Sequence, residues 1–150
     1  MSANDIKSYL DSQKLKYLVI QHSPAYTAQE IAQTAHISGK ELAKTVIVKI
    51  DGVLAMVVEP ANEKVNLEKV KRAVGADEVV IASEYEFQDK FPNCELGAMP
   101  PLGPLYGMLV YVVKRLTEDQ DIVFNAGSHA ELIKMAYKDF AALVKPTIIE

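Results

Sequence analysis

Hydrophobic and polar positions alternate along the chain with two periods, one typical of helices and one typical of strands. Ile6, Tyr9 and Leu10 recur at helical spacing within residues 2–12. Residues 17–20 form a short run of types that favour strands. The pattern therefore predicts an N-terminal helix that leads into a strand.

The clearest local pattern is that of a β-hairpin. Two β-branched runs, residues 46–50 and 53–58, are separated only by Asp51 and Gly52. This dipeptide suits a type I′ turn because both of its positions tolerate a positive φ. We therefore expect the two runs to pair as antiparallel strands.

Several segments carry the signal of a helix start. Three of them have a Ser or Thr followed three residues later by a Glu, the signature of a capping box. They are Thr27 with Glu30, Ser83 with Glu86, and Ser128 with Glu131. They predict helices over residues 27–34, 83–90 and 128–135. Asn66 predicts a further start, for a helix over 67–74, and a last helix is expected over 137–144.

The remaining pattern predicts strands at 79–81, 107–113 and 122–124 and one shaped loop. Residues 96–104 contain three prolines and two glycines, which exclude regular structure there. The chain shows no internal repeat. We predict a single α/β (α+β) domain over residues 1–150 with a mixed, largely antiparallel sheet.

Composition fits an ordinary globular protein, with 49% hydrophobic and 24% charged residues among 150. Its apolar runs are too short to span a bilayer, and residues 1–5 do not resemble a signal peptide, so a cytoplasmic location is expected. The net charge is −4 and the isoelectric point is near 5.4. A global basic field is therefore excluded, and any nucleic-acid contact must be local.

The sequence offers little for metal, cofactor or thiol chemistry. The single cysteine, Cys94, excludes an internal disulfide and a Cys-rich zinc site, and it has only a weak case as a nucleophile against a packing role. His22, His36 and His129 lack metal-ligand spacing. G-x-S-x-G, P-loop and G-x-G-x-x-G motifs are absent from the sequence. We expect no metal and no cofactor.

Lys44 is a candidate for site chemistry because strand alternation places it in one row with Val46 and Val48. A lysine at the end of a core-facing row can enter a cleft as a point charge for a phosphate or a developing oxyanion. The alternative is that its ammonium extends from a strand edge into water.

His129 is a second candidate, since it follows a glycine and Ser128 at a predicted strand-to-helix junction. Free backbone N–H groups there would allow a ligand to approach closely. The alternative makes Ser128 a helix cap and His129 a solvated residue of the first turn.

Four segments together resemble the YbaK-type family of aminoacyl-tRNA deacylases, which is similar to the editing insertion domain of bacterial prolyl-tRNA synthetase. They are residues 22–32, 42–46, 97–103 and 125–129. The resemblance implies a sheet curled toward a barrel with flanking helices. It also implies hydrolysis of the ester that links a wrong amino acid to the 3′ end of tRNA.

The resemblance also implies roles for individual residues. Lys44 matches the signature lysine of the family and is the expected catalytic residue. Substrate binding is expected from the helix-start residue Thr27, from the pocket wall formed by Gly97, Ala98, Met99, Pro100 and Pro101, and from Gly127, Ser128 and His129, the last as a specificity histidine. The chain departs from the family at residues 112–115, Val-Val-Lys-Arg, where many relatives have an acidic residue. This departure alters the charge expected at the rim and the contact expected with the substrate's α-amino group.

An aminoacyl ester is already reactive, so its hydrolysis requires positioning and oxyanion stabilisation more than a side-chain nucleophile. The first hypothesis is a free-standing deacylase acting in trans on Ala attached to proline tRNA, with Cys and Ser esters next. Its expected partners are the mischarged tRNA 3′ end and a synthetase, with no membrane and no DNA. A basic rim would contact tRNA and comprises Lys40, Lys49, Lys71, Arg72, Lys114 and Arg115. The alternative is a non-catalytic module that binds an aminoacyl-nucleotide, a tRNA end or a synthetase.

Overall fold

The computed structural model describes residues 3–21, 42–92 and 94–150. The helical elements are α1 (Ala3–Ser12), α3 (Leu67–Val74), α4 (Glu84–Phe87), η1 (Gln88–Lys90), η2 (Gly103–Leu105), α5 (Lys114–Thr117) and α6 (Tyr137–Val144). The strands are β1 (Tyr17–Gln21), β2 (Ala43–Ile50), β3 (Val53–Pro60), β4 (Val79–Ile81), β5 (Leu109–Val113), β6 (Asp121–Asn125), β7 (Glu131–Ala136) and β8 (Thr147–Ile149).

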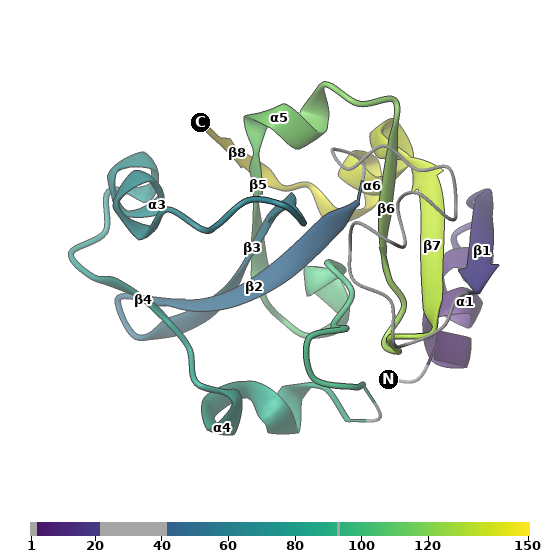
Figure 1. The fold of residues 1–150 in the computed structure, drawn as a ribbon, viewed down its shortest axis with the longest axis horizontal. Helices are drawn as coiled ribbons and strands as arrows, with labels where there is room; N and C mark the ends of the chain where they lie inside the picture. Colours follow the sequence, from purple (N-terminus) through teal and green to yellow (C-terminus); the bar gives the residue numbers. More distant parts are fainter. Residues whose placement is uncertain (1–2, 22–41, 93) are drawn as a thin grey trace.

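The described strands form two sheets (Figure 1). One has the order β1-β7-β6 and is antiparallel throughout. The other has the order β4-β2-β3-β5-β8, in which β5 and β8 are parallel to their neighbours. A single parallel bridge between Leu42 and Val123 connects the sheets, and neither sheet closes into a barrel within the described residues. The predicted mixed, largely antiparallel α+β fold is confirmed.

The predicted hairpin is present as β2 and β3. Its turn residues both have a positive φ, 49° for Asp51 and 85° for Gly52, as a type I′ turn requires. The Asp51 carboxylate accepts hydrogen bonds from the backbone N–H groups of Asp77 (3.0 Å) and Glu78 (2.8 Å). The turn is thereby tied to the segment between α3 and β4.

Two of the predicted helix starts are confirmed. Asn66 caps α3, and its side chain accepts from the backbone N–H of Lys69 at 3.1 Å. Ser83 and Glu86 form the expected capping box of α4, which continues as the 3-10 turn η1. The start predicted at Thr27 lies outside the described residues.

The helix predicted over 128–135 is wrong, because residues 131–136 form strand β7. This strand lies between β1 and β6 and pairs with both of them. The Ser128 hydroxyl accepts from the backbone N–H of Ala130 (3.0 Å) inside the turn that joins β6 to β7. Pairing on two sides has overridden the helix preference of a segment that contains Glu, Leu, Lys, Met and Ala.

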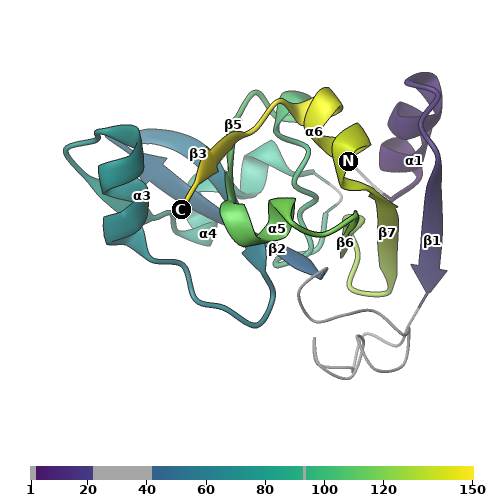
Figure 2. The same cartoon turned by 90° about the horizontal axis from the view of Figure 1, so that it is seen from above.

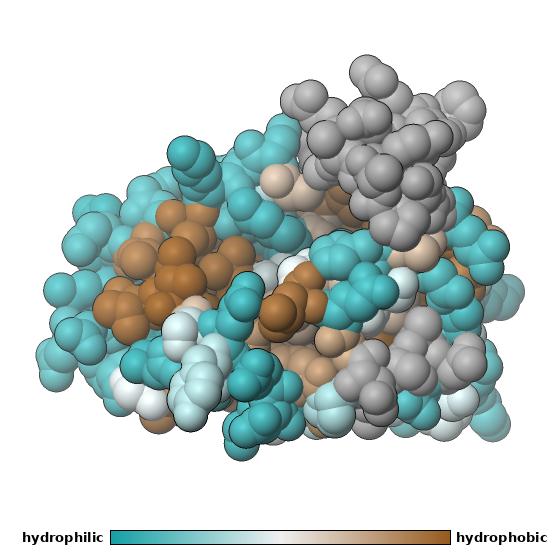
Figure 3. All heavy atoms as spheres, turned by 60° about the horizontal axis from the view of Figure 1, so that its bottom comes forward, coloured by the Kyte–Doolittle hydropathy of each residue, from teal (hydrophilic) through white to brown (hydrophobic). Residues whose placement is uncertain are grey.

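The two sheets and their helices enclose one main apolar core, in which Met56, Leu102, Phe124 and Phe140 are fully buried. Viewed from above, α3 lies at one end of the molecule, and α1 with β1 lies at the other (Figure 2). On the face shown in Figure 3, separate apolar areas lie among hydrophilic side chains. Within the described residues, no helix is both long and apolar enough to cross a bilayer.

Candidate functional site

The glycine-containing loop and the turn after β6 are joined by backbone hydrogen bonds. The Gly127 N–H donates to the Ala98 carbonyl, and the Glu95 N–H donates to the Gly127 carbonyl, both at 2.9 Å. The Glu95 carboxylate accepts from the backbone N–H of His129 at 2.9 Å. The His129 Nε2 atom lies 2.5 Å from the carbonyl oxygen of Leu96. The structure thus brings together the two segments that the sequence singled out.

Gly97 leaves space for the imidazole of His129. Its φ is +82°, and a Cβ added there would lie 3.3 Å from Cε1 of His129. The rest of the predicted pocket wall is buried: Ala98, Met99, Pro100 and Pro101. The exposed glycine is therefore the point at which this wall meets solvent.

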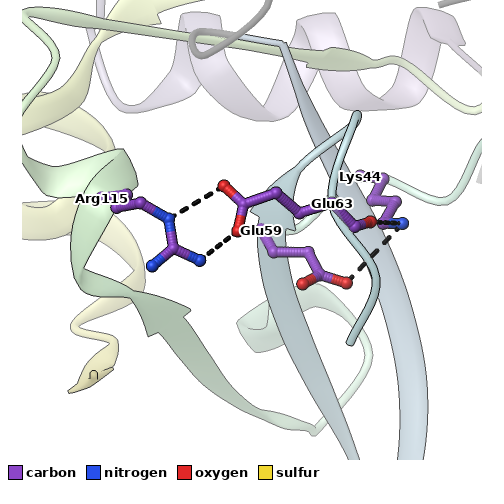
Figure 4. A network of polar contacts seen from close by, with 4 residues as sticks. All are labelled: Lys44, Glu59, Glu63 and Arg115. Atoms are coloured by element: carbon purple, nitrogen blue, oxygen red, sulfur yellow. Dashed lines mark hydrogen bonds and ion pairs between the residues drawn. The ribbon is translucent and has the colours of Figure 1, made fainter. Parts of the chain in front are cut away.

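Lys44 belongs to a different polar cluster (Figure 4). It lies opposite Glu59 in the β2–β3 ladder, and its Nζ is 3.7 Å from Glu59 Oε1. The same ammonium donates a hydrogen bond to the backbone carbonyl of Glu63. About a third of the Lys44 side chain, 35%, is exposed. Its head group is therefore held on two sides, at the end of a side chain that is partly exposed.

Glu59 is the buried charge of this cluster. The residue is 2% exposed, and its Oε1 has no hydrogen-bond partner within the described residues despite its ion pair with Lys44. Burial raises the pKa of the Glu59 carboxyl, while the charge of Lys44 opposes that rise. The site therefore contains an incompletely satisfied carboxyl group next to the expected catalytic lysine.

Arg115 of α5 completes the cluster from the other side. Its Nε donates to Glu63 Oε2 at 2.9 Å, and a second N–H donates to Oε1 of the same carboxylate. A cavity of about 200 Å³ opens beside this pair, and it is lined in part by Glu59, Lys69, Val57 and Arg115. Arg115 is one of the residues at which the chain departs from the family pattern, and its positive charge is neutralised by the Glu63 carboxylate.

The predicted site residues therefore form two groups. The described residues include no polar contact of Lys44 with the glycine loop or with His129. Strand register places Lys44 on one sheet face with Glu59, whereas Gly103 packs against Val110, which lies on the opposite face. A single pocket containing both groups stays a prediction, and Thr27 lies outside the described residues.

Most of the described cations of the predicted rim have acidic partners. Lys49 pairs with Glu86 at 2.5 Å, Lys114 pairs with Glu150 at 3.5 Å, and Arg115 pairs with Glu63. Lys71 and Arg72 lie on α3, and Lys40 lies outside the described residues. The described part of the rim therefore carries less free positive charge than its sequence suggests.

The sequence also raises the possibilities of a reactive thiol and of a metal site. Cys94 is partly buried, and its Sγ lies 3.8 Å from the hydroxyl of Tyr106. In the part of the chain that the structure describes, no three His, Cys, Asp or Glu side chains are grouped so that they could hold a metal ion.

Sequence reasoning missed Glu59 and Glu63. A usable signal was present for Glu59, since the Asp51-Gly52 turn fixes the register that pairs residue 44 with residue 59. A glutamate that ends an apolar strand and lies opposite a candidate lysine is a recognisable pattern. The contact of Lys44 with the Glu63 carbonyl depends on the path of the chain after β3, which no local pattern predicts.

Comparison with known proteins identifies a family and several relatives that match part or nearly all of the chain. The family model of the aminoacyl-tRNA editing domain matches residues 22–143. Proline–tRNA ligases of Bacillus mycoides (strain KBAB4) and Bacillus cereus (strain AH187) are each 32% identical over 75 residues. This match spans 50% of the chain but only 13% of the length of those ligases.

Two solved structures share the fold. One is a candidate trans-editing enzyme for prolyl-tRNA synthetase, with a TM-score of 0.82 and 19% identity over 99% of this chain and 96% of that one. The other is a scaffold protein for presenting linear epitopes, with a TM-score of 0.82 and 19% identity over 97% and 93% of the two chains. The resemblance to YbaK-type editing domains is confirmed, and the chain belongs to the aminoacyl-tRNA editing domain family.

Proposed function

We propose that the chain is a deacylase that acts in trans and hydrolyses the ester of a misacylated tRNA. Its first expected substrate is Ala on proline tRNA, followed by Cys and Ser esters. The observation that carries the proposal is the editing-domain match over residues 22–143. The segment shared with proline–tRNA ligases supports proline tRNA as the carrier.

The reaction requires little from side chains. Water attacks the ester carbonyl carbon, the bond from that carbon to the ribose oxygen breaks, and a proton from water passes to the ribose oxygen. The free amino acid and uncharged tRNA leave. Water or a neighbouring ribose hydroxyl carries the proton, so the protein's task is to position the ester and stabilise the oxyanion.

Lys44 is the proposed catalytic residue. Its accessible ammonium can bind the phosphate of the terminal nucleotide or the developing oxyanion as a compact point charge. The donors of Gly127 and Ala98 are already engaged by backbone carbonyls. The N–H of Gly97 has no acceptor among the described residues, so it is the backbone donor best suited to support the ester oxygen.

Selectivity is proposed to reside in the proline-bounded wall and in His129. A rigid wall excludes large side chains by size, but it discriminates poorly against smaller ones, because one methylene is worth only about 1–3 kcal/mol. The backbone N–H of His129 donates to the Glu95 carboxylate, and its ring is held next to Gly97 by the hydrogen bond between Nε2 and the Leu96 carbonyl. We therefore expect glycine esters to be hydrolysed as well.

The proposed partners are the 3′ end of a mischarged tRNA and, secondarily, a synthetase. The test is a deacylation assay on a panel of tRNAs charged with Ala, Cys, Ser and Gly, with Lys44→Ala as the control. Hydrolysis of at least one ester by the wild type, and its loss in the control, is the expected result. Persistence of every ester would overturn the proposal and favour a non-catalytic binding module.

A further inference from the structure

Glu59 occupies an unfavourable position for a carboxylate. It is the only buried charged side chain among the described residues, and it follows four buried apolar residues of β3, Ala55–Val58. Removing an ionised carboxylate from water is costly unless the group is both paired and hydrogen-bonded. Its presence here therefore needs a physical explanation.

Stability does not supply that explanation. The ion pair with Lys44 is 3.7 Å long, and Oε1 of Glu59 has no hydrogen-bond partner within the described residues. Replacing a whole buried ion pair by well-packed apolar side chains is often neutral or stabilising. Without Glu59, Lys44 would not become a buried unpaired charge, because its side chain is 35% exposed and its ammonium still donates to the Glu63 carbonyl. Residue 59 therefore gains little for the fold by being a glutamate.

The geometry around Lys44 suggests what the carboxylate does. A lysine ammonium has three N–H donors and ends a long flexible chain. One donor of Lys44 is used by the Glu63 carbonyl, and a second faces Glu59. The third donor has no partner among the described residues, so it is left for a ligand. Arg115 binds the Glu63 side chain and so steadies the segment that provides the carbonyl (Figure 4).

We infer that Glu59 is a positioning residue for Lys44, whose carboxylate holds the ammonium so that its third N–H points at the substrate. The inference rests on the proposed function, because it is Lys44 that touches the substrate phosphate or carbonyl oxygen. Glu59 itself acts only through Lys44. Its removal should therefore slow the reaction and leave the fold intact.

The first test is single-turnover hydrolysis of Ala on proline tRNA by Glu59→Gln and Glu59→Val. Both should react about 10- to 100-fold more slowly than the wild type, because the ammonium loses the ion-pair partner that orients it, and a small misplacement of a reacting group has an effect of this size. Asp121→Asn is the matched control, since Asp121 pairs with Lys134 at 3.9 Å and neither residue belongs to the proposed site or rim, and it should keep the wild-type rate. The Tm of Glu59→Val should equal or exceed that of the wild type.

A double-mutant cycle separates positioning from a structural role. In a Lys44→Ala background, Glu59→Gln should cause no further loss of rate, because the group that Glu59 positions is absent. An equal loss in both backgrounds would overturn the inference.

The pH profile provides a second readout. Because burial raises the pKa of Glu59, its protonation should weaken the hold on Lys44 and lower the rate on the acid side. The charged groups facing Glu59 are Lys44 of β2, Arg115 of α5, and Glu63, Lys64, Lys69 and Glu150 around the cavity. Glu59→Gln should remove the acid limb, and an unchanged profile would contradict the inference.

The mobility of the Lys44 side chain is measurable without any substrate. NMR relaxation at its Cε should show an ordered group in the wild type and a mobile one in Glu59→Gln. Unchanged order in the variant, or unchanged rates in an active enzyme, would overturn the inference. A wild-type protein that hydrolyses no ester would instead overturn the proposed function.

Discussion

Gly97 lies beside the imidazole of His129: a Cβ on Gly97 would lie 3.3 Å from Cε1 and 3.6 Å from Nε2 of the ring. The glycine has a φ of +82°, which favours residues without a Cβ. A side chain at position 97 of the pocket wall would therefore displace the ring of His129, the proposed specificity residue.

Gly97→Ala should impair hydrolysis in addition to stability. The left-handed backbone should cost about 1–2 kcal/mol of unfolding free energy, and the new methyl group should displace His129. Gly52→Ala is the matched control, because Gly52 has a φ of +85° and nothing within 4 Å of an added Cβ. Urea denaturation and deacylation assays on both variants check this. Equal rates for the two variants would argue against a role for the Gly97–His129 contact.

His129→Ala should change the ratio of rates between small and larger aminoacyl esters more than it changes stability. The ring lies beside the pocket wall, so its loss should enlarge the space available to the amino-acid side chain. Rates for Gly, Ala, Ser and Cys esters and the Tm provide the comparison. A uniform loss across all esters would indicate a general catalytic or structural role.

Lys44→Ala should lower the deacylation rate about 100-fold or more, the usual effect of losing an oxyanion-stabilising group, near 3 kcal/mol. Lys44→Arg should have a deacylation rate close to that of Lys44→Ala, because a planar guanidinium replaces a compact point charge. Single-turnover rates of the three proteins measure both effects. A wild-type rate in Lys44→Ala would remove the residue from the mechanism.

The structure revises the stability expected for Lys44→Ala. A lysine at a cleft edge would contribute little to folding, but Lys44 pairs with the buried Glu59. Its removal leaves that carboxylate unpaired and should cost about 1–3 kcal/mol of unfolding free energy at neutral pH. Chemical denaturation of Lys44→Ala with and without Glu59→Gln is the measurement. If adding Glu59→Gln to Lys44→Ala recovers no unfolding free energy, the loss of the Lys44–Glu59 ion pair is not the cause of the destabilisation.

The raised pKa of Glu59 predicts a pH dependence of stability. The folded protein retains the proton of the Glu59 carboxyl to a higher pH than the unfolded chain does. The stabilising contribution of this protonation is therefore complete below the pKa that Glu59 has in the unfolded chain. It is lost as the pH rises through the folded pKa. The stability advantage of Glu59→Val over the wild type should therefore grow from about pH 4 towards neutrality. Urea titrations at several pH values check this, and a constant difference would contradict it.

Binding of tRNA should be weak and only slightly dependent on salt. The net charge is −4, and three of the rim cations are paired with carboxylates. Each phosphate contacted contributes about −0.9 to the slope of log affinity against log salt. Affinities measured across salt concentrations should give a slope that corresponds to a few phosphates. A slope that requires many would contradict a site confined to the terminal nucleotides.

Local signals predicted those parts of the fold that depend on backbone conformation. Asp51 and Gly52 specified both the turn type and the register of β2 and β3. Asn66 and Ser83 marked real helix starts, since a cap is satisfied by neighbours in sequence.

Signals that depend on distant partners were missed or misinterpreted. Ser128 resembled a cap, yet the following residues pair with strands on both sides. The strand β8 was not predicted, since its three residues pair, among the described strands, only with β5. The single sheet expected from sequence is instead two sheets, joined at Leu42 and Val123. Residues 97–103 and 125–129 could be linked only through the family resemblance, because their hydrogen bonds span about thirty positions.

The position of β7 between β1 and β6 constrains when the protein can fold. Tyr17 of β1 pairs with Met135 of β7, so β1 has to wait for its partner until synthesis has passed residue 135. The β2–β3 hairpin, in contrast, closes through a two-residue turn. Pairing of segments so far apart in sequence is slow, and until it occurs the apolar side of β1 is exposed to other chains. During translation, therefore, the hairpin should form early and the three-stranded sheet last.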